Sequence, residues 1–326
     1  MDVSCAFATS PATPEHIVVA ETLGYRRAWC YDSPALYPDV WMILALAAQA
    51  TSQIGLGPAV LVPSLRHPMV NAAAIATLES LAPGRVAVAV GSGFTGRYTL
   101  GQTPMPWSRV AEYTRALRSL LRGEETMWDG ALIQMIHPDG FVADRPIEVP
   151  ILIAAGGPKG TAVAHEVGDG IFWAGKPAQQ DAGPEWRALL VHGTVLDPGE
   201  DLTSERVFDA VGHAIAVIFH GSYERNGSAG VDRLPGGTQW RKAIEAIPQD
   251  RRHLAIHEGH LVYVCERDRL AVREGLGLLS STMTGNAKEL AERVKALADR
   301  GVTEIVLQPA GQDIQRELER FIEAVD

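Results

Sequence analysis

A glycine-rich turn at residues 155–161 has the composition of an anion-binding loop. Glycines let a ligand approach the backbone closely, and the free N–H groups at the start of a helix bind anions with the help of the helix dipole. The turn follows an apolar run and reads Ala155-Gly156-Gly157-Pro158-Lys159-Gly160-Thr161. This pattern predicts a phosphate-binding site at the end of a strand, and a tight turn without a ligand is the alternative.

A second glycine motif has the spacing G-x-G-x-x-G and follows another apolar run. Its residues are Gly91-Ser92-Gly93-Phe94-Thr95-Gly96. In a dinucleotide site, a helix opens at the third glycine and an acidic residue ends a second strand about 20 residues later. Here Pro104 and Pro106 interrupt the stretch 97–106, and Glu112 falls within a predicted helix. We therefore favour a glycine-rich strand exit over a Rossmann site.

Three histidines lie close together in the stretch 252–260, namely His253, His257 and His260. On one helix, His253 and His257 would share a face and could bind zinc. The metalloprotease spacing H-E-x-x-H is not formed, and Gly259 is expected to end the helix before His260. We therefore expect no metal site and interpret these histidines as the polar lining of a substrate pocket.

Asp32 follows a predicted strand, within Trp29-Cys30-Tyr31-Asp32-Ser33-Pro34. A carboxylate at the carboxyl end of a barrel strand faces the active site. The sequence Asp-Ser-Pro also suits a turn or a helix cap, so both interpretations stay open. Arg66 and His67 follow the next predicted strand, where they can cap a helix or face the same site.

The elements that must position these residues alternate between apolar runs and amphipathic patterns. The expected strands are 3–8, 28–31, 54–62, 86–90, 151–154, 170–173, 303–307 and an apolar run at 189–196. The expected helices are 14–23, 40–50, 69–81, 107–121, 160–167, 184–190, 286–300 and 314–325. Alternation at this spacing predicts a parallel sheet with crossover helices, and eight strands indicate a (β/α)8 TIM barrel.

We expect a single domain over residues 1–326, with a short hairpin at Asp129-Gly130 and a large insertion at about 197–284. The insertion is rich in Gly, His and short helical pieces. Insertions of this length on a barrel are usually functional, often as a cover for the substrate.

The composition excludes several classes of protein. The 326 residues include 29 Lys+Arg against 39 Asp+Glu, a net charge of −10 without a basic run, so we expect no nucleic-acid partner. The 3 cysteines are too widely spaced for a disulfide framework. The first residues do not resemble a signal peptide, and no apolar run exceeds about 11 residues, too few to cross a membrane. We therefore expect a cytoplasmic protein.

Taken together, these features resemble the luciferase-like monooxygenase superfamily. The likeness is greatest to the branch that uses the deazaflavin coenzyme F420, such as methylenetetrahydromethanopterin reductase. It is carried by the stretches 21–29 with Asp32, 54–68, 76–85, 91–93, 154–158 and 301–304. The match is good over residues 3–169, moderate over the last helix–strand–helix, and weakest across the insertion.

The resemblance implies a barrel that forms a homodimer through its second and third helices. It also implies that the cofactor ring lies against the third strand, where a bulge and a non-prolyl cis peptide would fall at Ala59–Val60. The implied cofactor-binding residues are Asp32, Ala59, Val60, Leu61, Gly91, Ser92, Gly93, Ala154, Ala155, Gly156, Gly157, Pro158 and Lys159. The phosphate would lie on the 155–158 turn.

The implied reaction is hydride transfer between coenzyme F420 and a small organic substrate. The family's sugar-phosphate dehydrogenases carry a His and a Glu where this chain has Ser33 and Phe94, so sugar oxidation is not expected. The candidates for a proton donor are Asp32, Tyr37, His67, Glu112, His257 and His260. The alternatives are an FMN-dependent monooxygenase on the same barrel, a metal-dependent hydrolase, and a flavin-binding protein without activity.

Overall fold

A computed structural model of the chain describes residues 1–175 and 183–325, which form two compact units. The first unit comprises Met1–Gly96, Thr103–Leu190 and Arg300–Val306, and the second comprises Arg97–Gln102, Val191–Asp299 and Leu307–Asp326. The single domain expected from the sequence stays a prediction. Among the described residues, no helix is both long and apolar enough to cross a membrane.

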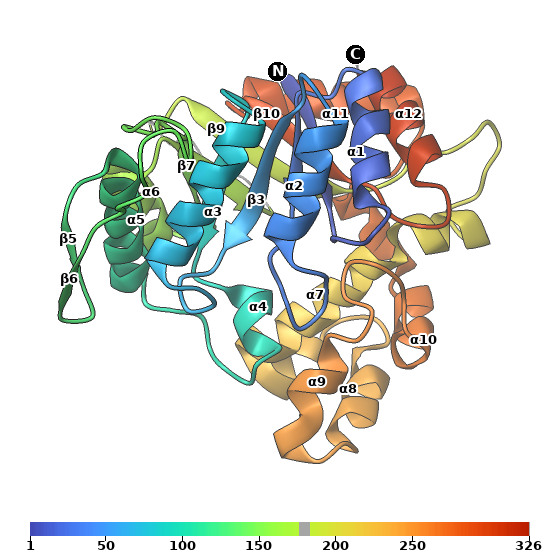
Figure 1. Cartoon of the computed structure of the whole chain (residues 1–326). Helices are drawn as coiled ribbons and strands as arrows, with labels where there is room; N and C mark the ends of the chain where they lie inside the picture. Colours follow the sequence, from blue (N-terminus) through green and yellow to red (C-terminus); the bar gives the residue numbers. More distant parts are fainter. Residues whose placement is uncertain (176–182, 326) are drawn as a thin grey trace. The chain divides into compact units, whose positions relative to one another are not determined.

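Eight strands close into a barrel in the order β1-β10-β9-β8-β7-β4-β3-β2. Figure 1 labels β3, β7, β9 and β10 among the helices. The strands run parallel in the pairs β1–β2, β2–β3, β3–β4, β4–β7, β7–β8 and β8–β9. The strands are β1 Asp2–Phe7, β2 Arg27–Cys30, β3 Gly55–Leu61, β4 Val88–Gly91, β7 Ile151–Ala154, β8 Gly170–Ala174, β9 Trp186–His192 and β10 Glu304–Gln308. This closure confirms the predicted TIM barrel and excludes the open sheet that a Rossmann site requires.

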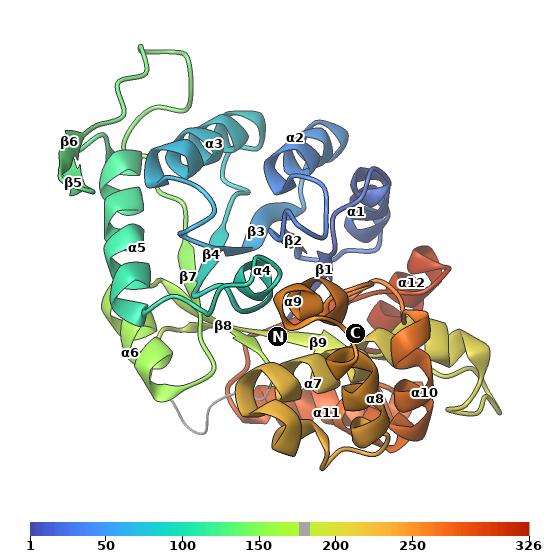
Figure 2. The same ribbon diagram turned by 90° about the horizontal axis from the view of Figure 1, so that it is seen from below.

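Helices of the first unit cover the outside of these strands. They are α1 Thr13–Thr22, α2 Val40–Ala50, α3 Pro68–Leu81, α5 Trp107–Arg122 and α6 Pro158–Val167. Each packs against the next one along the chain, and Figure 2 shows them side by side around the strands. The predicted hairpin is present as β5 Thr126–Trp128 and β6 Ala131–Ile133, with Asp129 and Gly130 at positive φ in its turn.

The second unit is mostly helical. Its helices are α7 Glu205–Val231, α8 Gly237–Glu245, η1 Gln249–Arg251, α9 Arg252–Ile256, α10 Glu266–Glu274, η2 Leu276–Ser281, α11 Ala287–Asp299 and α12 Ile314–Val325. α7, α8 and α10 pack against one another around Phe208, Phe219 and Trp240. The expectation of short helical pieces is wrong for α7, which has 27 residues and a break at Gly227, where φ is 63°.

One predicted helix is wrong. Residues 186–192 form strand β9, which pairs with β8 from Gly170↔Trp186 to Ala174↔Leu190. A buried parallel strand is an unbroken apolar run, so its periodicity does not distinguish it from a buried helix. A short helix, α4 Phe94–Tyr98, was not predicted and follows directly after Gly93. The expected strand at 189–196 overlaps β9 but begins three residues and ends four residues too late. The remaining predicted strands and helices are confirmed with ends within two residues.

A buried carboxylate joins three strands at their amino-terminal ends. Glu304 opens β10 and is 1% exposed. Its Oε1 accepts a hydrogen bond from Trp29 Nε1 at 3.1 Å, and its Oε2 accepts from Trp186 Nε1 and from Arg27 at 3.4 Å. Arg27 and Trp186 open β2 and β9. This end of a TIM barrel contributes to stability, whereas the opposite end carries active sites.

Candidate functional site

Two acidic side chains share one arginine beyond the carboxyl ends of β2 and β3. Asp32 lies two residues after β2, and Arg66 lies between β3 and α3. Arg66 donates to Asp32 Oδ2 at 2.5 Å and to Asp39 Oδ2 at 2.7 Å. Asp39 also caps α2, since its Oδ1 accepts from the backbone N–H groups of Trp41 and Met42. Asp39, and not Asp32, is therefore the helix cap in this segment.

The two carboxylates differ in their tendency to hold a proton. Burial raises the pKa of Asp32, and the attraction of Arg66 offsets this only in part. Burial also acts on Asp39, but its hydrogen bonds from Arg66 and the α2 backbone outweigh it and lower the pKa. A buried carboxyl with a raised pKa and one cationic partner is typical of proton-transfer sites. Asp32 is thus the acid–base candidate of this pair.

The carboxyl ends of β3, β4 and β7 lie side by side, and the side chains of Val60 and Ala154 lie against Gly91. The Ala59–Val60 peptide is cis, and the β3–β4 register shifts between Ala59 and Leu61, so the expected cis bond and bulge are confirmed. A Cβ added at Gly91 would lie 3.0 Å from Val60 Cγ2 and 3.5 Å from Ala154 Cβ. A larger residue at position 91 would therefore press on Val60 beside the bulge.

The predicted anion loop forms the start of α6. Gly157 is the N-cap residue, with φ −143° and ψ 170° and no side-chain cap, and Pro158 begins the helix. A Cβ at Gly156 or Gly157 would meet no described atom within 4 Å. A Cβ at Gly160 would lie 2.5 Å from the Trp107 ring, so that glycine is required by packing. The helix start is thus open where an anion would bind.

The structure places the implied cofactor residues on neighbouring elements of the first unit. They lie at the end of β3, at the end of β4 and beyond it, and at the end of β7 and the start of α6. In that order they are Ala59, Val60 and Leu61; Gly91, Ser92 and Gly93; and Ala154, Ala155, Gly156, Gly157, Pro158 and Lys159. Since β4 pairs with both β3 and β7, these segments form one continuous stretch.

Two further polar atoms of the first unit belong to residues outside the predicted set of site residues. Tyr31 Oη, beyond β2, and Trp173 Nε1, on β8, are buried without a hydrogen-bond partner among the described residues. Buried polar groups are nearly always hydrogen-bonded, so both are candidates to contact a ligand. The nearby candidate Tyr37 is also buried, which raises its pKa, and its ring centroid is 6.3 Å from that of Tyr31.

Two proton-donor candidates have contacts that are typical of structural residues. His67 Nδ1 accepts from the Met69 N–H at 3.1 Å and so caps α3, which was one of its two interpretations. Glu112 lies on the exposed side of α5 and pairs with Arg109 at 2.7 Å. Among the contacts of the described residues, none joins either side chain to Asp32. Their catalytic role stays a prediction.

The histidines of the insertion are arranged differently from the expectation. α9 ends at Ile256, so His253 and His257 do not share a helix face. Positive φ values at Gly259 and Leu261 turn the chain back on itself. His257 and His260 then meet His220 from α7, a residue not singled out from the sequence. All three are buried in the second unit, and their role as pocket lining stays a prediction.

Comparisons with known proteins agree with this geometry. A family model described as luciferase-like monooxygenase matches residues 8–192. The chain is 36% identical over 179 residues to an F420-dependent glucose-6-phosphate dehydrogenase of Beutenbergia cavernae, covering 48% of this chain and half of that relative. It is 27% identical to a relative of the same name from Intrasporangium calvum, over 94% of this chain and 91% of the relative.

A solved structure matches along the whole chain. It is the coenzyme F420-dependent tetrahydromethanopterin reductase from Methanopyrus kandleri, with a TM-score of 0.68 and 21% identity, covering 100% of this chain and 99% of that one. At this identity the likeness concerns the fold, and it agrees with the closed barrel.

Proposed function

The chain belongs to the luciferase-like monooxygenase family, and on that basis we propose that it is an oxidoreductase that uses coenzyme F420. The reaction is hydride transfer to or from a small organic substrate. Two relatives, one of them similar along nearly its whole length, are named as F420-dependent enzymes, which supports this choice. FMN is the alternative cofactor, since it would bind at the same strand ends.

One observation carries the proposal. An open helix start follows β7, a glycine ends β4 and a bulge interrupts β3, and these three strands are neighbours in the barrel. This arrangement suits an elongated cofactor with a planar ring at one end and a phosphate at the other. The ring would lie against Val60 and Gly91, and the phosphate would lie on the N–H groups that follow Gly157. The buried Tyr31 Oη and Trp173 Nε1 offer further polar contacts.

The protein's own residues would bind and orient the cofactor and the substrate, and one of them would exchange a proton with the substrate. When bound, the deazaflavin supplies a carbon that carries a hydride as a two-electron donor or acceptor. Asp32 is the proposed proton-exchange group, because its pKa is raised by burial. Arg66 holds that carboxylate in place through the 2.5 Å hydrogen bond. Tyr31 and Tyr37 surround the same segment with buried rings, which keeps water away.

The substrate is proposed to differ from that of the named relatives. The family's sugar-phosphate dehydrogenases place a His and a Glu at the positions of Ser33 and Phe94. The helix α4, which begins at Phe94, lies beside Ser33, since a Cβ at Gly96 in α4 would lie 3.6 Å from Ser33 Oγ. Neither residue titrates near neutral pH, so the pair cannot take a proton from an alcohol. We therefore propose reduction of a small organic substrate over oxidation of a sugar.

The proposal includes a homodimer formed through α2 and α3. Met42 and Leu46 on α2 and Val70 on α3 are 71%, 55% and 53% exposed. Because the two helices pack side by side, these side chains belong to neighbouring surfaces. Apolar side chains grouped in this way are typical of subunit contacts. Sedimentation velocity is expected to give the mass of a dimer, and a monomer at all concentrations would contradict this.

A parallel titration tests the cofactor. The full chain is titrated with coenzyme F420 and with FMN, and quenching of tryptophan fluorescence is followed. We expect F420 to bind at low micromolar concentration and FMN to bind much more weakly. Tighter binding of FMN would move the assignment to an oxygen-using monooxygenase, and binding of neither would overturn the cofactor site.

A further inference from the structure

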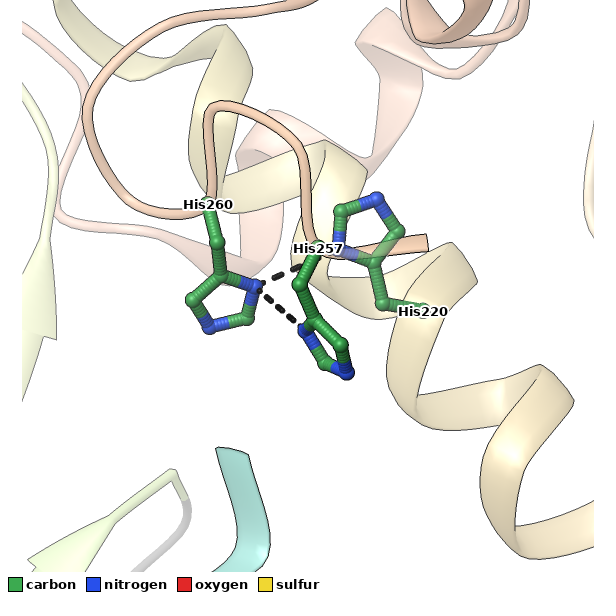
Figure 3. A group of neighbouring side chains, drawn as sticks. All are labelled: His220, His257 and His260. Carbon is green, nitrogen blue, oxygen red and sulfur yellow. Dashed lines mark hydrogen bonds between the residues drawn. The ribbon is translucent and has the colours of Figure 1, made fainter. Parts of the chain in front are cut away.

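Three histidine rings converge in the interior of the second unit. His220 lies on α7, and His257 and His260 lie in the turn that follows α9. His260 Nδ1 is 3.3 Å from His220 Nδ1 and 3.2 Å from His257 Nδ1 (Figure 3). The three residues are 1%, 0% and 4% exposed. Three ring nitrogens therefore face one another in a space that water does not readily reach.

The opposite nitrogens of two of these rings are held by carboxylates. His220 Nε2 is 3.0 Å from Asp268 Oδ2, and His257 Nε2 is 2.6 Å from Glu224 Oε1. Asp268 is itself fixed, since its Oδ1 accepts from Trp240 Nε1 at 2.6 Å. A carboxylate accepts hydrogen bonds, so each Nε2 carries the hydrogen and each Nδ1 of a neutral ring presents a lone pair. Carboxylates orient metal-binding histidines in this way.

Hydrogen bonds among the three rings cannot satisfy all of the facing nitrogens. An imidazole nitrogen has a single in-plane position, which holds either one hydrogen or one lone pair. His260 Nδ1 therefore pairs with only one of its two neighbours, whatever the protonation of the rings. The Nδ1 of the other neighbour is then left without a full hydrogen bond inside the cluster, in a buried place where this loss is costly.

A metal ion would satisfy all three nitrogens at once. For a tetrahedral zinc ion with Zn–N distances of about 2.0–2.1 Å, two ligand nitrogens lie about 3.3 Å apart. The two Nδ1–Nδ1 distances of 3.2 and 3.3 Å have this value. One ring nitrogen from each of the three residues can be chosen so that all lie within 4.8 Å of one another.

The charges around the cluster favour a divalent cation. The side chains of Asp268 and Glu224 are 1% and 5% exposed, and with neutral rings they bring two negative charges into the interior. Buried charges are normally paired, and a divalent ion would balance these two. Glu224 Oε2 is in addition buried without a hydrogen-bond partner among the described residues.

We propose that His220, His257 and His260 bind a divalent ion of the zinc class through their Nδ1 atoms. Asp268 and Glu224 orient the first two rings from outside. Three protein nitrogens leave a fourth position for water. The ligands come from α7 and from the turn after α9, so the ion ties these segments together and stabilises the second unit. This site differs from the His253–His257 pair considered from the sequence, and it is independent of the cofactor site.

Metal content and cobalt absorption test the proposal on the wild-type chain. The full chain, without a histidine tag, is produced with added zinc, dialysed against metal-free buffer and analysed by mass spectrometry for metals. We expect about one zinc per chain and a thermal midpoint that falls when a chelator removes it. Cobalt added to the metal-free protein is expected to give the visible absorption of a tetrahedral site. A folded chain that retains no zinc, shows no zinc-dependent midpoint and gives no cobalt band would overturn the proposal.

Variants locate the ion within the chain. His260→Ala is expected to lose the bound zinc, and Glu224→Gln, which keeps all three ligands, is expected to weaken zinc binding by about 10- to 100-fold. His253→Ala is the matched control, since this histidine lies on α9 outside the cluster, and it should retain wild-type affinity. If His260→Ala fails to fold, the zinc affinity of Glu224→Gln tests the site in its place. Wild-type zinc affinity in the variant that folds would place the ion elsewhere and refute the site.

Discussion

Replacing Glu304 with leucine is expected to lower the free energy of unfolding by about 3–5 kcal/mol, the range found when one partner of a buried ion pair is removed. The carboxylate accepts from two indole N–H groups, those of the buried Trp29 and the half-buried Trp186, and pairs with Arg27. The substitution leaves all three donors in an interior without an acceptor. Burial lowers the pKa of Arg27, whereas the neighbouring Glu304 carboxylate raises it.

Urea denaturation followed by circular dichroism measures this loss. Glu304→Gln keeps the shape and one carbonyl acceptor, so we expect a smaller decrease for it than for Glu304→Leu. Glu112→Leu is the matched control, because it removes an exposed partner of Arg109, and such surface pairs contribute about 0–1 kcal/mol. Equal losses for Glu304→Leu and Glu112→Leu would show that the buried network does not stabilise the barrel.

Replacing Gly157 with aspartate is expected to weaken binding of coenzyme F420 by roughly 5- to 1000-fold. This prediction rests on the proposed phosphate position. A carboxylate about 4 Å from the phosphate costs between about 1 kcal/mol in water and about 4 kcal/mol near a protein surface. The fold should tolerate the change, because the space is open, φ is −143°, and aspartate is a preferred N-cap residue.

Asparagine at the same position separates charge from shape. Gly157→Asn adds a side chain of the same size with the same capping ability, but it carries no charge. We expect this variant to bind the cofactor within a few-fold of wild type, as measured by the same fluorescence titration. If both variants lost binding equally, the effect would be steric. If neither lost it while the wild type bound F420, the phosphate would lie elsewhere.

The local elements of this protein are largely readable from its sequence. Residues 40–50 and 151–154 are predicted with their observed ends, because a cap, a proline or an apolar run marks each boundary. The open glycine turn before α6 was predicted from composition alone. The cis peptide at Ala59–Val60 was expected only from the family resemblance, because no local sequence pattern requires it. The error at β9 shows where local patterns stop being informative, since an unbroken apolar run fits both a buried strand and a buried helix.

Contacts between distant segments were decided only by the tertiary structure. Glu304 meets Arg27 and Trp186 because closure of the barrel brings the starts of β10, β2 and β9 together. His220 meets His260 because the positive φ of Gly259 and Leu261 turns the chain back toward α7. The sequence by itself determined the barrel, its order of elements and the residue types at its strand ends, because these depend on local periodicity. It did not determine which distant side chains share a buried space, because that depends on how the elements pack.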